Sequence, residues 1–218
     1  MQVDGKLTDI GIQAHTDKAY YHKFTPVYER FLFDKKDTIK QIVEVGVSTG
    51  ASLKMWDIYL SNAKILGLDV LVHPSYKDTF SERVSIAKCD ATNEAELIST
   101  FATYSIFPGS VDLFIDDGSH FVSHQIKTFG LAWKYVKSGG LYIIEDMHTS
   151  VQDLIGKHPH MLRDDGWIDM KPETSARVIG TMYGYKNSFP CVNENEIEHI
   201  AYVSNVQTSS LTCIFTKK

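Results

Sequence analysis

The stretch IKQIVEVGVSTGASLKMWDIYL, residues 39–60, decides the fold class of this chain. The run from Ile39 to Val45 is rich in β-branched side chains, which predicts a buried strand. Gly46 and Gly50 mark a turn after this strand, and residues 51–60 predict a helix. A strand that passes through a glycine turn into a helix lets a ligand approach backbone N–H groups at the strand's carboxyl end. The stretch therefore predicts the first βα unit of a nucleotide-binding α/β fold.

The middle of the chain repeats this alternation of short apolar runs and longer helical stretches, as is typical around a parallel sheet. Further strands are predicted over 64–69, 84–88, 111–116 and 141–145, and further helices over 93–103 and 123–136. Two strand-like runs joined by polar residues, 198–203 and 211–215, predict an antiparallel pair. We therefore expect an α/β fold with a doubly wound, Rossmann-like, mostly parallel seven-stranded sheet and a C-terminal antiparallel strand pair, in a single domain.

We expect this domain of 218 residues to have four parts. They are an N-terminal cover at 1–38, a core for cofactor and metal at 39–147, a substrate lid at 148–195 and the C-terminal strand pair at 196–218. The lid is assigned because the periodic pattern breaks after Asp146, where scattered charges and three of the six prolines follow.

The charge balance limits the partners of this chain. It has 22 Lys and Arg residues against 27 Asp and Glu, and the net charge of −5 offers no basic footprint for nucleic acid or an anionic membrane surface. No apolar run approaches the length of a membrane span, and the first residues lack the apolar core of a signal peptide. Three widely spaced cysteines are typical of reduced, buried thiols. We therefore expect a cytoplasmic protein.

Two aspartates at strand ends extend the nucleotide-pocket pattern. Asp69 ends the predicted second strand, 23 residues after Gly46, where a carboxylate can accept hydrogen bonds from both ribose hydroxyls. Asp90 follows the third strand, in a position suited to an adenine amino group. Each aspartate alone is more typical of a turn or a helix cap. Together they favour an adenosine pocket, with NAD or FAD as the alternative because the G-x-G-x-x-G fingerprint is incomplete.

Acidic residues also end two neighbouring predicted strands. Asp116 and Asp117 end the fourth strand, and Glu145 and Asp146 end the fifth. Carboxylates brought together in a cleft repel one another unless protons or a cation compensate. A ligand set made only of oxygen atoms indicates a hard ion, magnesium first and manganese or calcium next. The strand ends therefore predict a divalent-metal site.

Histidines beside these strand ends are candidates for a catalytic base. His120 lies three residues after Asp117, and His148 is the alternative for that role or for substrate binding. Zinc at His120 and His124 is a weaker alternative, because H-E-x-x-H is absent and no cysteine is nearby. A helix cap at His120 or at an aspartate would explain one strand end but not both. No P-loop is present to support phosphoryl transfer.

The motifs at these strand ends are similar to those of a known family. IDDGSH at 115–120, HQIKTF at 124–129 and GGLYIIEDMHTS at 139–150 resemble the macrolide-sugar O-methyltransferases, the macrocin and mycinamicin O-methyltransferase family. The resemblance extends to EVGVSTGASLKMW at 44–56 and HTDKAYYHKFTPVYERF at 15–31, so it covers most of the chain up to residue 150. It departs at residues 89–92, where the family often reads GDQ-S-D and this chain reads CDAT, which retains Asp90.

The resemblance implies a class I methyltransferase that uses S-adenosylmethionine and Mg²⁺, with Mn²⁺ as a substitute. It implies that two neighbouring sugar hydroxyls chelate the metal and that His120 is the general base. The metal ligands that it implies are Asp117, Glu145 and Asp146. The cofactor-binding residues that we expect are Lys18, Glu44, Gly46, Asp69, Asp90 and Asp116. The substrate residues that we expect are His22, Thr25 and His148.

The expected acceptor is a sugar hydroxyl of a deoxyhexose such as rhamnose, in a glycan or a glycosylated product. The chain would act by itself, as a homo-oligomer, or as a domain of a larger glycan-assembly enzyme. The alternatives are a Mg²⁺-dependent methyltransferase of a catechol or phenol, an Fe(II)-dependent hydroxylase-like relative and a non-catalytic binding domain. An iron site would need two histidines and one carboxylate, for which His120, His124 and Asp117 are the candidates.

Overall fold

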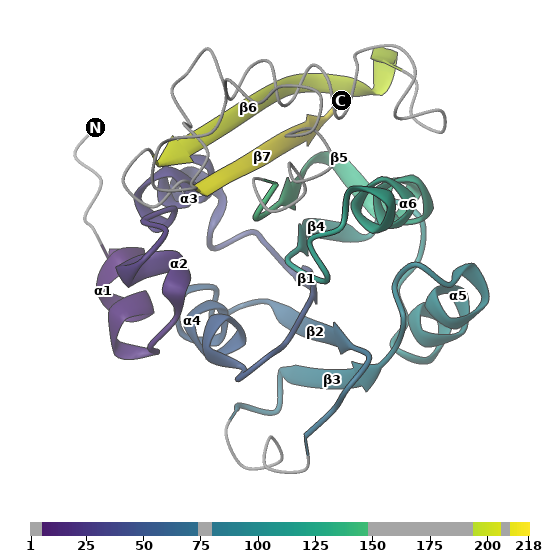
Figure 1. Cartoon of the computed structure of the whole chain (residues 1–218), viewed down its shortest axis with the longest axis horizontal. Helices are drawn as coiled ribbons and strands as arrows, with labels where there is room; N and C mark the ends of the chain where they lie inside the picture. The colour runs from purple at the N-terminus through teal and green to yellow at the C-terminus, as the bar shows by residue number, and fades with distance from the viewer. Residues whose placement is uncertain (1–5, 74–79, 148–193, 206–209) are drawn as a thin grey trace, which may run out of the picture.

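A computed structural model describes residues 6–73, 80–147, 194–205 and 210–218 of the chain. In these residues a central sheet lies between two helical layers (Figure 1). The strands are β1 (Gln41–Val45), β2 (Lys64–Asp69), β3 (Val84–Lys88), β4 (Val111–Asp116), β5 (Val136–Ile144), β6 (Ile197–Asn205) and β7 (Ser210–Lys217). The α-helices are α1 (Lys6–Gln13), α2 (Asp17–Tyr20), α3 (Thr25–Leu32), α4 (Ala51–Tyr59), α5 (Glu94–Thr103) and α6 (Val122–Ala132). Short 3-10 turns are η1 (Phe33–Lys35), η3 (Trp133–Tyr135) and η6 (Glu194–Glu196).

The strand order of the sheet is β3-β2-β1-β4-β5-β7-β6. Strands β1 to β5 pair in parallel, and β7 runs antiparallel to both β5 and β6. The strand order reverses between β1 and β4, which is where open α/β sheets bind ligands at the carboxyl ends of their strands. The predicted mostly parallel sheet with a C-terminal antiparallel pair is confirmed.

The element bounds agree with the prediction to within two residues except around β5. Strands β2, β3 and β4 have the predicted bounds. The helix predicted over 123–136 ends at Ala132, and β5 begins at Val136 and not at Leu141. Gly139 lies inside this strand with a φ of 74°, where the pairing with β4 also shifts register. A glycine inside a strand weakens the apolar signal, so the pattern did not indicate the first half of β5.

The N-terminal cover is helical. Leu7 and Ile10 of α1 and Tyr28 and Leu32 of α3 are buried in the same cluster as Trp56 of α4. Proline in the first turn of α3 is favourable because that position needs no N–H donor. The cover therefore packs on one face of the sheet through α4.

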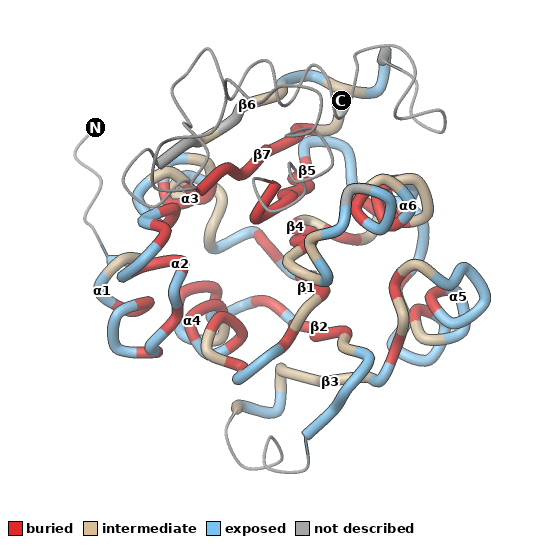
Figure 2. The backbone as a smooth tube through the Cα atoms, in the orientation of Figure 1, coloured by how far each residue is buried: buried red, intermediate tan, exposed pale blue. Residues whose placement is uncertain are grey.

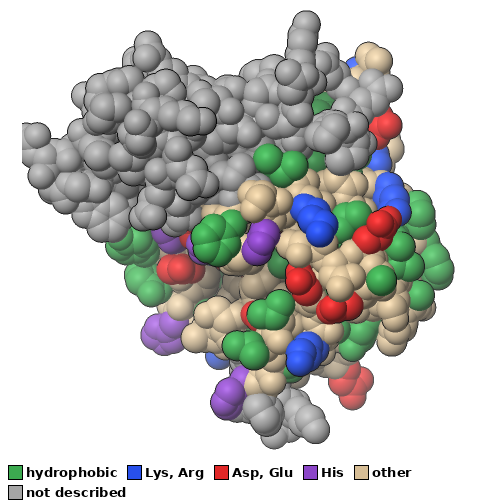
Figure 3. Space-filling model, turned by 45° about the vertical axis from the view of Figure 1, so that its right-hand side comes forward, with side chains coloured by type: hydrophobic (Ala, Val, Ile, Leu, Met, Phe, Trp, Pro, Cys, Tyr) green, Lys and Arg blue, Asp and Glu red, His purple; other side chains and the backbone are tan. Residues whose placement is uncertain are grey.

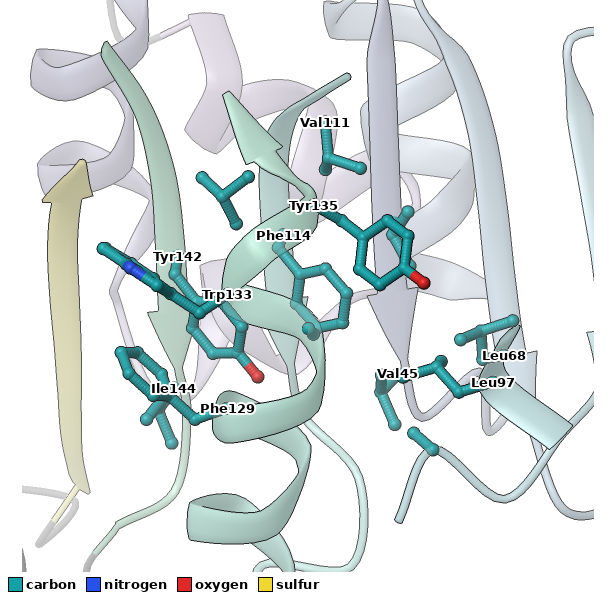
Figure 4. Packing of buried hydrophobic residues seen from close by; sticks show 14 of the residues in the cluster. Val45, Leu68, Leu97, Val111, Phe114, Phe129, Trp133, Tyr135, Tyr142 and Ile144 are labelled. Atoms are coloured by element: carbon teal, nitrogen blue, oxygen red, sulfur yellow. The ribbon is translucent and has the colours of Figure 1, made fainter. Parts of the chain in front are cut away.

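Each face of the sheet has its own buried cluster, because alternate residues of a strand point to opposite faces. Figure 2 shows this burial along the strands and the inner sides of the helices. Under α6 the cluster is aromatic, and the Phe129 ring centroid lies 4.7 Å from that of Tyr142 and 5.0 Å from that of Trp133 (Figure 4). These contacts fix α6 over β5 and so hold the start of α6 beside the strand ends.

The described surface carries charges of both signs. On the face shown in Figure 3, the Lys and Arg side chains of the described residues stand apart from one another. None of the described helices combines the length and apolar character needed to cross a bilayer. Cys89 and Cys213 are buried free thiols, and Cys191 lies outside the described residues. The predicted lid, 148–195, also lies outside them except for its last two residues.

Backbone hydrogen bonds continue the parallel pairing one residue past the strand ends. Gly46 N donates to Leu68 O over 2.8 Å, Asp117 N to Val45 O over 2.9 Å and Glu145 N to Asp116 O over 2.9 Å. Gly46 has a φ of 90°, and a Cβ atom there would lie 1.9 Å from the carbonyl oxygen of Asp117. Only glycine fits this position, because both the conformation and the close approach exclude a side chain.

We expect Gly46→Ala to lower the free energy of unfolding by about 3 kcal/mol or more, because left-handed strain and the clash with Asp117 act together. Gly109→Ala is the matched control, since its φ of 73° is similar but no atom lies within 4 Å of the added Cβ. That control should cost about 1 kcal/mol. Urea unfolding followed by circular dichroism measures both variants. Equal losses would contradict a backbone constraint between Gly46 and Asp117.

Candidate functional site

Two adjoining cavities lie along the carboxyl ends of the strands. The first has a volume of about 480 Å³, and the second about 330 Å³. Gly46, Asp69 and Gly118 line both cavities, so they form a continuous cleft beside the switch point between β1 and β4. The predicted site residues that line the first cavity are Lys18, Gly46, Asp69, Asp117, His120 and Asp146. Those that line the second are Gly46, Asp69, Asp90 and Asp116.

The acidic residues that follow β4 and β5 come together at the first cavity. His120 Nε2 lies 3.1 Å from Asp117 Oδ1 and 3.6 Å from Asp146 Oδ2. One candidate ligand atom from each of these three residues lies within 4.8 Å of the others. Glu145 is 1% exposed, and its Oε1 accepts no hydrogen bond within the described part of the chain. The group therefore offers several oxygen ligands and one imidazole to a cation.

Lys18 of α2 enters this acidic group from its buried side. Its ammonium group donates hydrogen bonds to Asp117 Oδ2 and, over 2.9 Å, to Glu145 Oε2. It also lies 3.6 Å from Glu44 Oε1, and Lys18 is only 1% exposed. Burial acts to lower the pKa of Lys18, but Asp117, Glu145 and Glu44 together raise it well above its usual value. Lys18 is therefore a buried cation.

Lys18 does not balance the negative charge of the whole group. Burial raises the pKa of Glu145 well above its usual value despite Lys18. Burial and the charge of Asp117 raise the pKa of Asp146 as well. Burial opposes the ionisation of Asp117, yet Lys18 and the hydrogen bond from His120 keep the pKa of Asp117 below its usual value. Raised carboxyl pKa values mean that the site favours protons or another cation.

Burial and neighbouring charges also shift the pKa values of His120, Asp116 and Glu44. Burial acts to lower the pKa of His120, but the hydrogen bond to Asp117 and the charge of Asp146 raise it overall. Burial raises the pKa of Asp116 to about 7, and its Oδ2 is a buried atom without a hydrogen bond to the described residues. Burial likewise raises the pKa of Glu44 to about 7, against the opposing charge of Lys18.

Four non-glycine residues that line the first cavity have a left-handed backbone. Their φ angles are 60° at His15, 48° at Ser48, 61° at His120 and 50° at Asp146. Such conformations are uncommon outside glycine and cluster at functional sites. Here the sharp turns at His120 and Asp146 follow two strands and direct both side chains to the same cation-binding group.

The aspartates of the predicted adenosine pocket have defined partners. Asp69 Oδ2 accepts from Val47 N over 2.8 Å and from Ser48 N over 3.2 Å, which holds the glycine turn against β2. Asp90 Oδ1 accepts from the backbone N and the hydroxyl of Thr92, and these bonds lower the pKa of Asp90. Both carboxylates border the cleft, where the prediction expects them. Their contacts with ribose and adenine stay predictions.

The remaining predicted residues lie beside or below the cleft. Glu44 lies under the first cavity, in contact with Lys18. His22 Nε2 is 3.8 Å from Asp146 Oδ1, and His22 Nδ1 pairs with the Ser210 hydroxyl of β7. Thr25 is fully buried, where its hydroxyl is 2.9 Å from that of Thr8, and it lines neither cavity. His148 lies outside the described residues.

Several lining residues had no signal of their own in the sequence. They include Thr16, Tyr20, Ser48, Ser119 and Thr128. Polar residues of these types occur throughout the chain, so composition and spacing could not single them out. All of them lie in motifs that carried the resemblance, at 15–31, 44–56, 115–120 and 124–129, which was the available indication.

Comparison with known proteins confirms the resemblance that the motifs indicated. Mycinamicin VI 2''-O-methyltransferase of Micromonospora griseorubida is 33% identical over 152 residues, which are 66% of this chain and 36% of that relative. The 8-demethyl-8-alpha-L-rhamnosyl tetracenomycin-C 2'-O-methyltransferase of Streptomyces olivaceus is 27% identical over 151 residues, 66% of this chain and 38% of that relative. The chain thus spans little more than a third of these relatives. No model of a known protein family matches the chain.

A solved structure shares the fold. MycE methyltransferase from the mycinamycin biosynthetic pathway has a TM-score of 0.69 and 24% sequence identity, and the match covers 97% of this chain and 54% of MycE. That structure is a complex with Mg and SAH, and another MycE structure also contains mycinamycin VI. The seven-stranded sheet of this chain is therefore a methyltransferase fold.

We expect the metal-free chain to become less stable from pH 5 to pH 7, and Glu44→Gln to reduce that loss. The folded pKa of Glu44 is about 7, against an ordinary value of 4.5, so the folded chain holds this proton more tightly than the unfolded chain. The resulting stabilisation is complete below about pH 4.5 and is lost as the pH rises through 7. Glu44 should contribute a slope of up to about 1.4 kcal/mol per pH unit in this window.

The measurement is urea unfolding in EDTA at several pH values. Glu94→Gln of α5, which replaces an exposed glutamate, is the matched control and should keep the wild-type slope. If Glu44→Gln also keeps that slope, the raised pKa of Glu44 is wrong.

Proposed function

We propose that this chain, a relative of the macrocin and mycinamicin O-methyltransferases, transfers a methyl group from S-adenosylmethionine to a sugar hydroxyl with the help of a divalent cation. The observation that carries this proposal is the meeting of Asp117, His120 and Asp146 at one end of a cleft that also contains Gly46 and Asp69. A group that can hold a cation thus lies beside a pocket of the nucleotide-binding type. Sugar O-methylation by the curated relatives supports the same reaction.

The residues at the strand ends fit a hard divalent cation. Asp117 and Asp146 offer carboxylate oxygens beside His120. Glu145 is not part of that group, but its Oε1 is a buried acceptor without a hydrogen bond to the described residues. Oxygen ligands suit Mg²⁺ best, with Mn²⁺ as a substitute. A divalent charge would also offset the repulsion that raises the pKa values of Glu145 and Asp146. The Mg found in the MycE structures supports this assignment.

The cleft also fits S-adenosylmethionine. The second cavity has apolar walls from Leu68, Val70 and Ala91, with Asp90 at its rim, as an adenine ring requires. Asp69 lies between the two cavities, where a carboxylate suits a ribose. Gly46 leaves the backbone open toward the first cavity, on the way to the metal ligands. The cofactor would thus span both cavities, with its methyl end toward His120.

The chain's own residues would activate the acceptor hydroxyl. When bound, S-adenosylmethionine supplies the methyl group and the divalent cation polarises the hydroxyl. His120 would accept the hydroxyl proton at an imidazole nitrogen, since it borders the cavity and is 31% exposed at its side chain. Asp117 orients the ring through its contact with Nε2, and Asp146 lies close enough to stabilise the imidazolium that results.

A sugar with two neighbouring hydroxyls is the proposed acceptor. Two adjacent oxygens can occupy two open positions of one cation, which a lone alcohol cannot do. The names of the curated relatives specify mycinamicin VI and a rhamnosyl tetracenomycin, which favours a deoxyhexose such as rhamnose. The chain would act on a glycan or a glycosylated product, by itself or as a domain of a longer enzyme, and a catechol is the alternative acceptor.

An Fe(II) hydroxylase receives less support from the geometry. A facial triad needs two histidines and one carboxylate. The group at the first cavity contains His120 with two carboxylates, Asp117 and Asp146. His124 lines the second cavity, and its Nδ1 is 2.7 Å from the Ser119 hydroxyl. The described residues therefore favour Mg²⁺ over iron.

The purified chain should bind S-adenosylmethionine in a calorimeter and methylate rhamnosides in the presence of Mg²⁺. EDTA should abolish methyl transfer, and Mn²⁺ should restore it, because the hydroxyl would not be polarised without a cation. A catechol panel under the same conditions distinguishes the alternative acceptor. A chain that binds no S-adenosylmethionine would refute the methyltransferase proposal.

Asp117→Asn and Glu145→Gln should each lower turnover by at least about 100-fold while the affinity for S-adenosylmethionine stays near wild type. Each substitution removes one negative charge from the cation site and leaves the adenosine pocket intact. Glu94→Gln of α5 is an exposed control of the same chemistry and should keep full turnover. Wild-type rates in both site variants, together with activity in EDTA, would exclude a metal mechanism.

A further inference from the structure

We propose that Lys18 is the positioning residue of the cation site: its ammonium group holds the inner oxygens of Asp117 and Glu145 so that their other oxygens serve the cation. This inference rests on the proposed function, which supplies the divalent cation. It assigns Lys18 a role toward the metal ligands and not toward the cofactor.

The contacts of Asp117 divide its two oxygens between an inner and an outer side. Oδ2 accepts from the ammonium group of Lys18, and Oδ1 is 3.1 Å from His120 Nε2. Lys18 is 1% exposed and the His120 side chain is 31% exposed, although both residues line the first cavity. A carboxylate held at one oxygen by a buried point charge has a fixed orientation. Lys18 therefore decides which oxygen of Asp117 is presented to the cavity side.

Glu145 is held in the same way. Its backbone is fixed at both ends, because Glu145 N donates to Asp116 O over 2.9 Å and Glu145 O accepts from Gln125 Nε2 over 2.9 Å. The side chain is anchored through Oε2, which accepts from Lys18 over 2.9 Å. Oε1 remains buried without a hydrogen bond to the described residues. A buried oxygen of this kind is costly unless a ligand satisfies it, and a cation at the site would do so.

A second interpretation is that Lys18 takes the place of the cation and competes with it. The geometry favours positioning. Lys18 contacts one oxygen each of Asp117 and Glu145, while the oxygens of Asp146 lie near His22 and His120. One candidate ligand atom each from Asp117, His120 and Asp146 lies within 4.8 Å of the others. The ammonium group of Lys18 contacts Asp117 through Oδ2, whereas His120 Nε2 contacts Oδ1.

The positioning residue comes from the N-terminal cover, 99 residues away from Asp117 in sequence. Helix α2 is only four residues long and depends on α1 for its place. Gly11 of α1 allows this, because a Cβ there would lie 2.6 Å from the Cβ of Ala19 and 3.0 Å from Met55 Sδ. The cover is therefore a structural part of the proposed cation site and not only a wall of the cleft.

This role is tested by titrating the whole purified chain with Mn²⁺ in the absence of cofactor. Electron paramagnetic resonance measures the free Mn²⁺. Lys18→Met should weaken Mn²⁺ binding by about tenfold or more, the range for residues that orient metal ligands. Lys18→Arg keeps the charge but not its position, and should bind Mn²⁺ with intermediate affinity. Lys54→Met, an exposed lysine of α4, is the matched control and should bind like wild type.

The outcomes separate this role from its alternatives. Tighter or unchanged Mn²⁺ binding by a folded Lys18→Met chain would overturn positioning, and tighter binding would indicate competition. Weaker S-adenosylmethionine binding with unchanged Mn²⁺ binding would also overturn it, in favour of a direct cofactor contact. If Lys18→Met does not fold, Lys18→Arg decides: weaker Mn²⁺ binding supports positioning and wild-type affinity overturns it. A wild-type chain that binds no Mn²⁺ refutes the proposed cation site itself, and with it this role.

Discussion

The close approach between Gly46 and the backbone of Asp117 is the constraint on which the rest of the site depends. The Cα of Gly46 faces the Asp117 carbonyl so closely that a Cβ would lie 1.9 Å from it. This approach follows from the parallel pairing, which continues past the strand ends through Asp117 N to Val45 O and Glu145 N to Asp116 O. Because each strand end is tied to the next, the glycine turn and the acidic residues lie along one edge. The cleft for a nucleotide and the group for a cation are thus consequences of the same hydrogen-bonded edge.

Buried charge is the second organising feature. Several carboxyl groups lie within a small volume; Lys18 is a buried cation among them, and the imidazoles of His120 and His22 lie beside Asp146. Desolvation penalises each charge, so the pKa values of Glu145, Asp146 and Glu44 rise even beside Lys18. A site in this state gains from a further cation, because the cation lets the carboxylates ionise. The proposed metal would therefore supply positive charge that the described residues do not provide.

The N-terminal cover contacts both the acidic residues at this edge of the sheet and the C-terminal strand β7. Lys18 reaches the carboxylates after β4 and β5, while His22 pairs with Ser210 and the Tyr28 hydroxyl lies 3.3 Å from that of Thr212. Ser210 and Thr212 belong to β7, the antiparallel strand inserted beside β5. Strand β7 thus has a role beyond closing the sheet, since it supplies the polar partners that hold the cover beside the cleft.

The sequence alone determined the βα order, the bounds of strands β2, β3 and β4 at 64–69, 84–88 and 111–116, and the acidic strand ends, because apolar periodicity and local turn residues depend on near neighbours. It also predicted that the acidic residues after β4 and β5 would come together, since adjacent parallel strands end at the same edge, and Asp117 and Asp146 do so. The first half of β5 was missed because Gly139 interrupts the apolar pattern. Only the tertiary structure decided that Lys18 lies among those carboxylates and that Thr25 lies apart from the cleft. Both depend on how the cover packs on α4, a long-range contact that leaves no local pattern in the sequence.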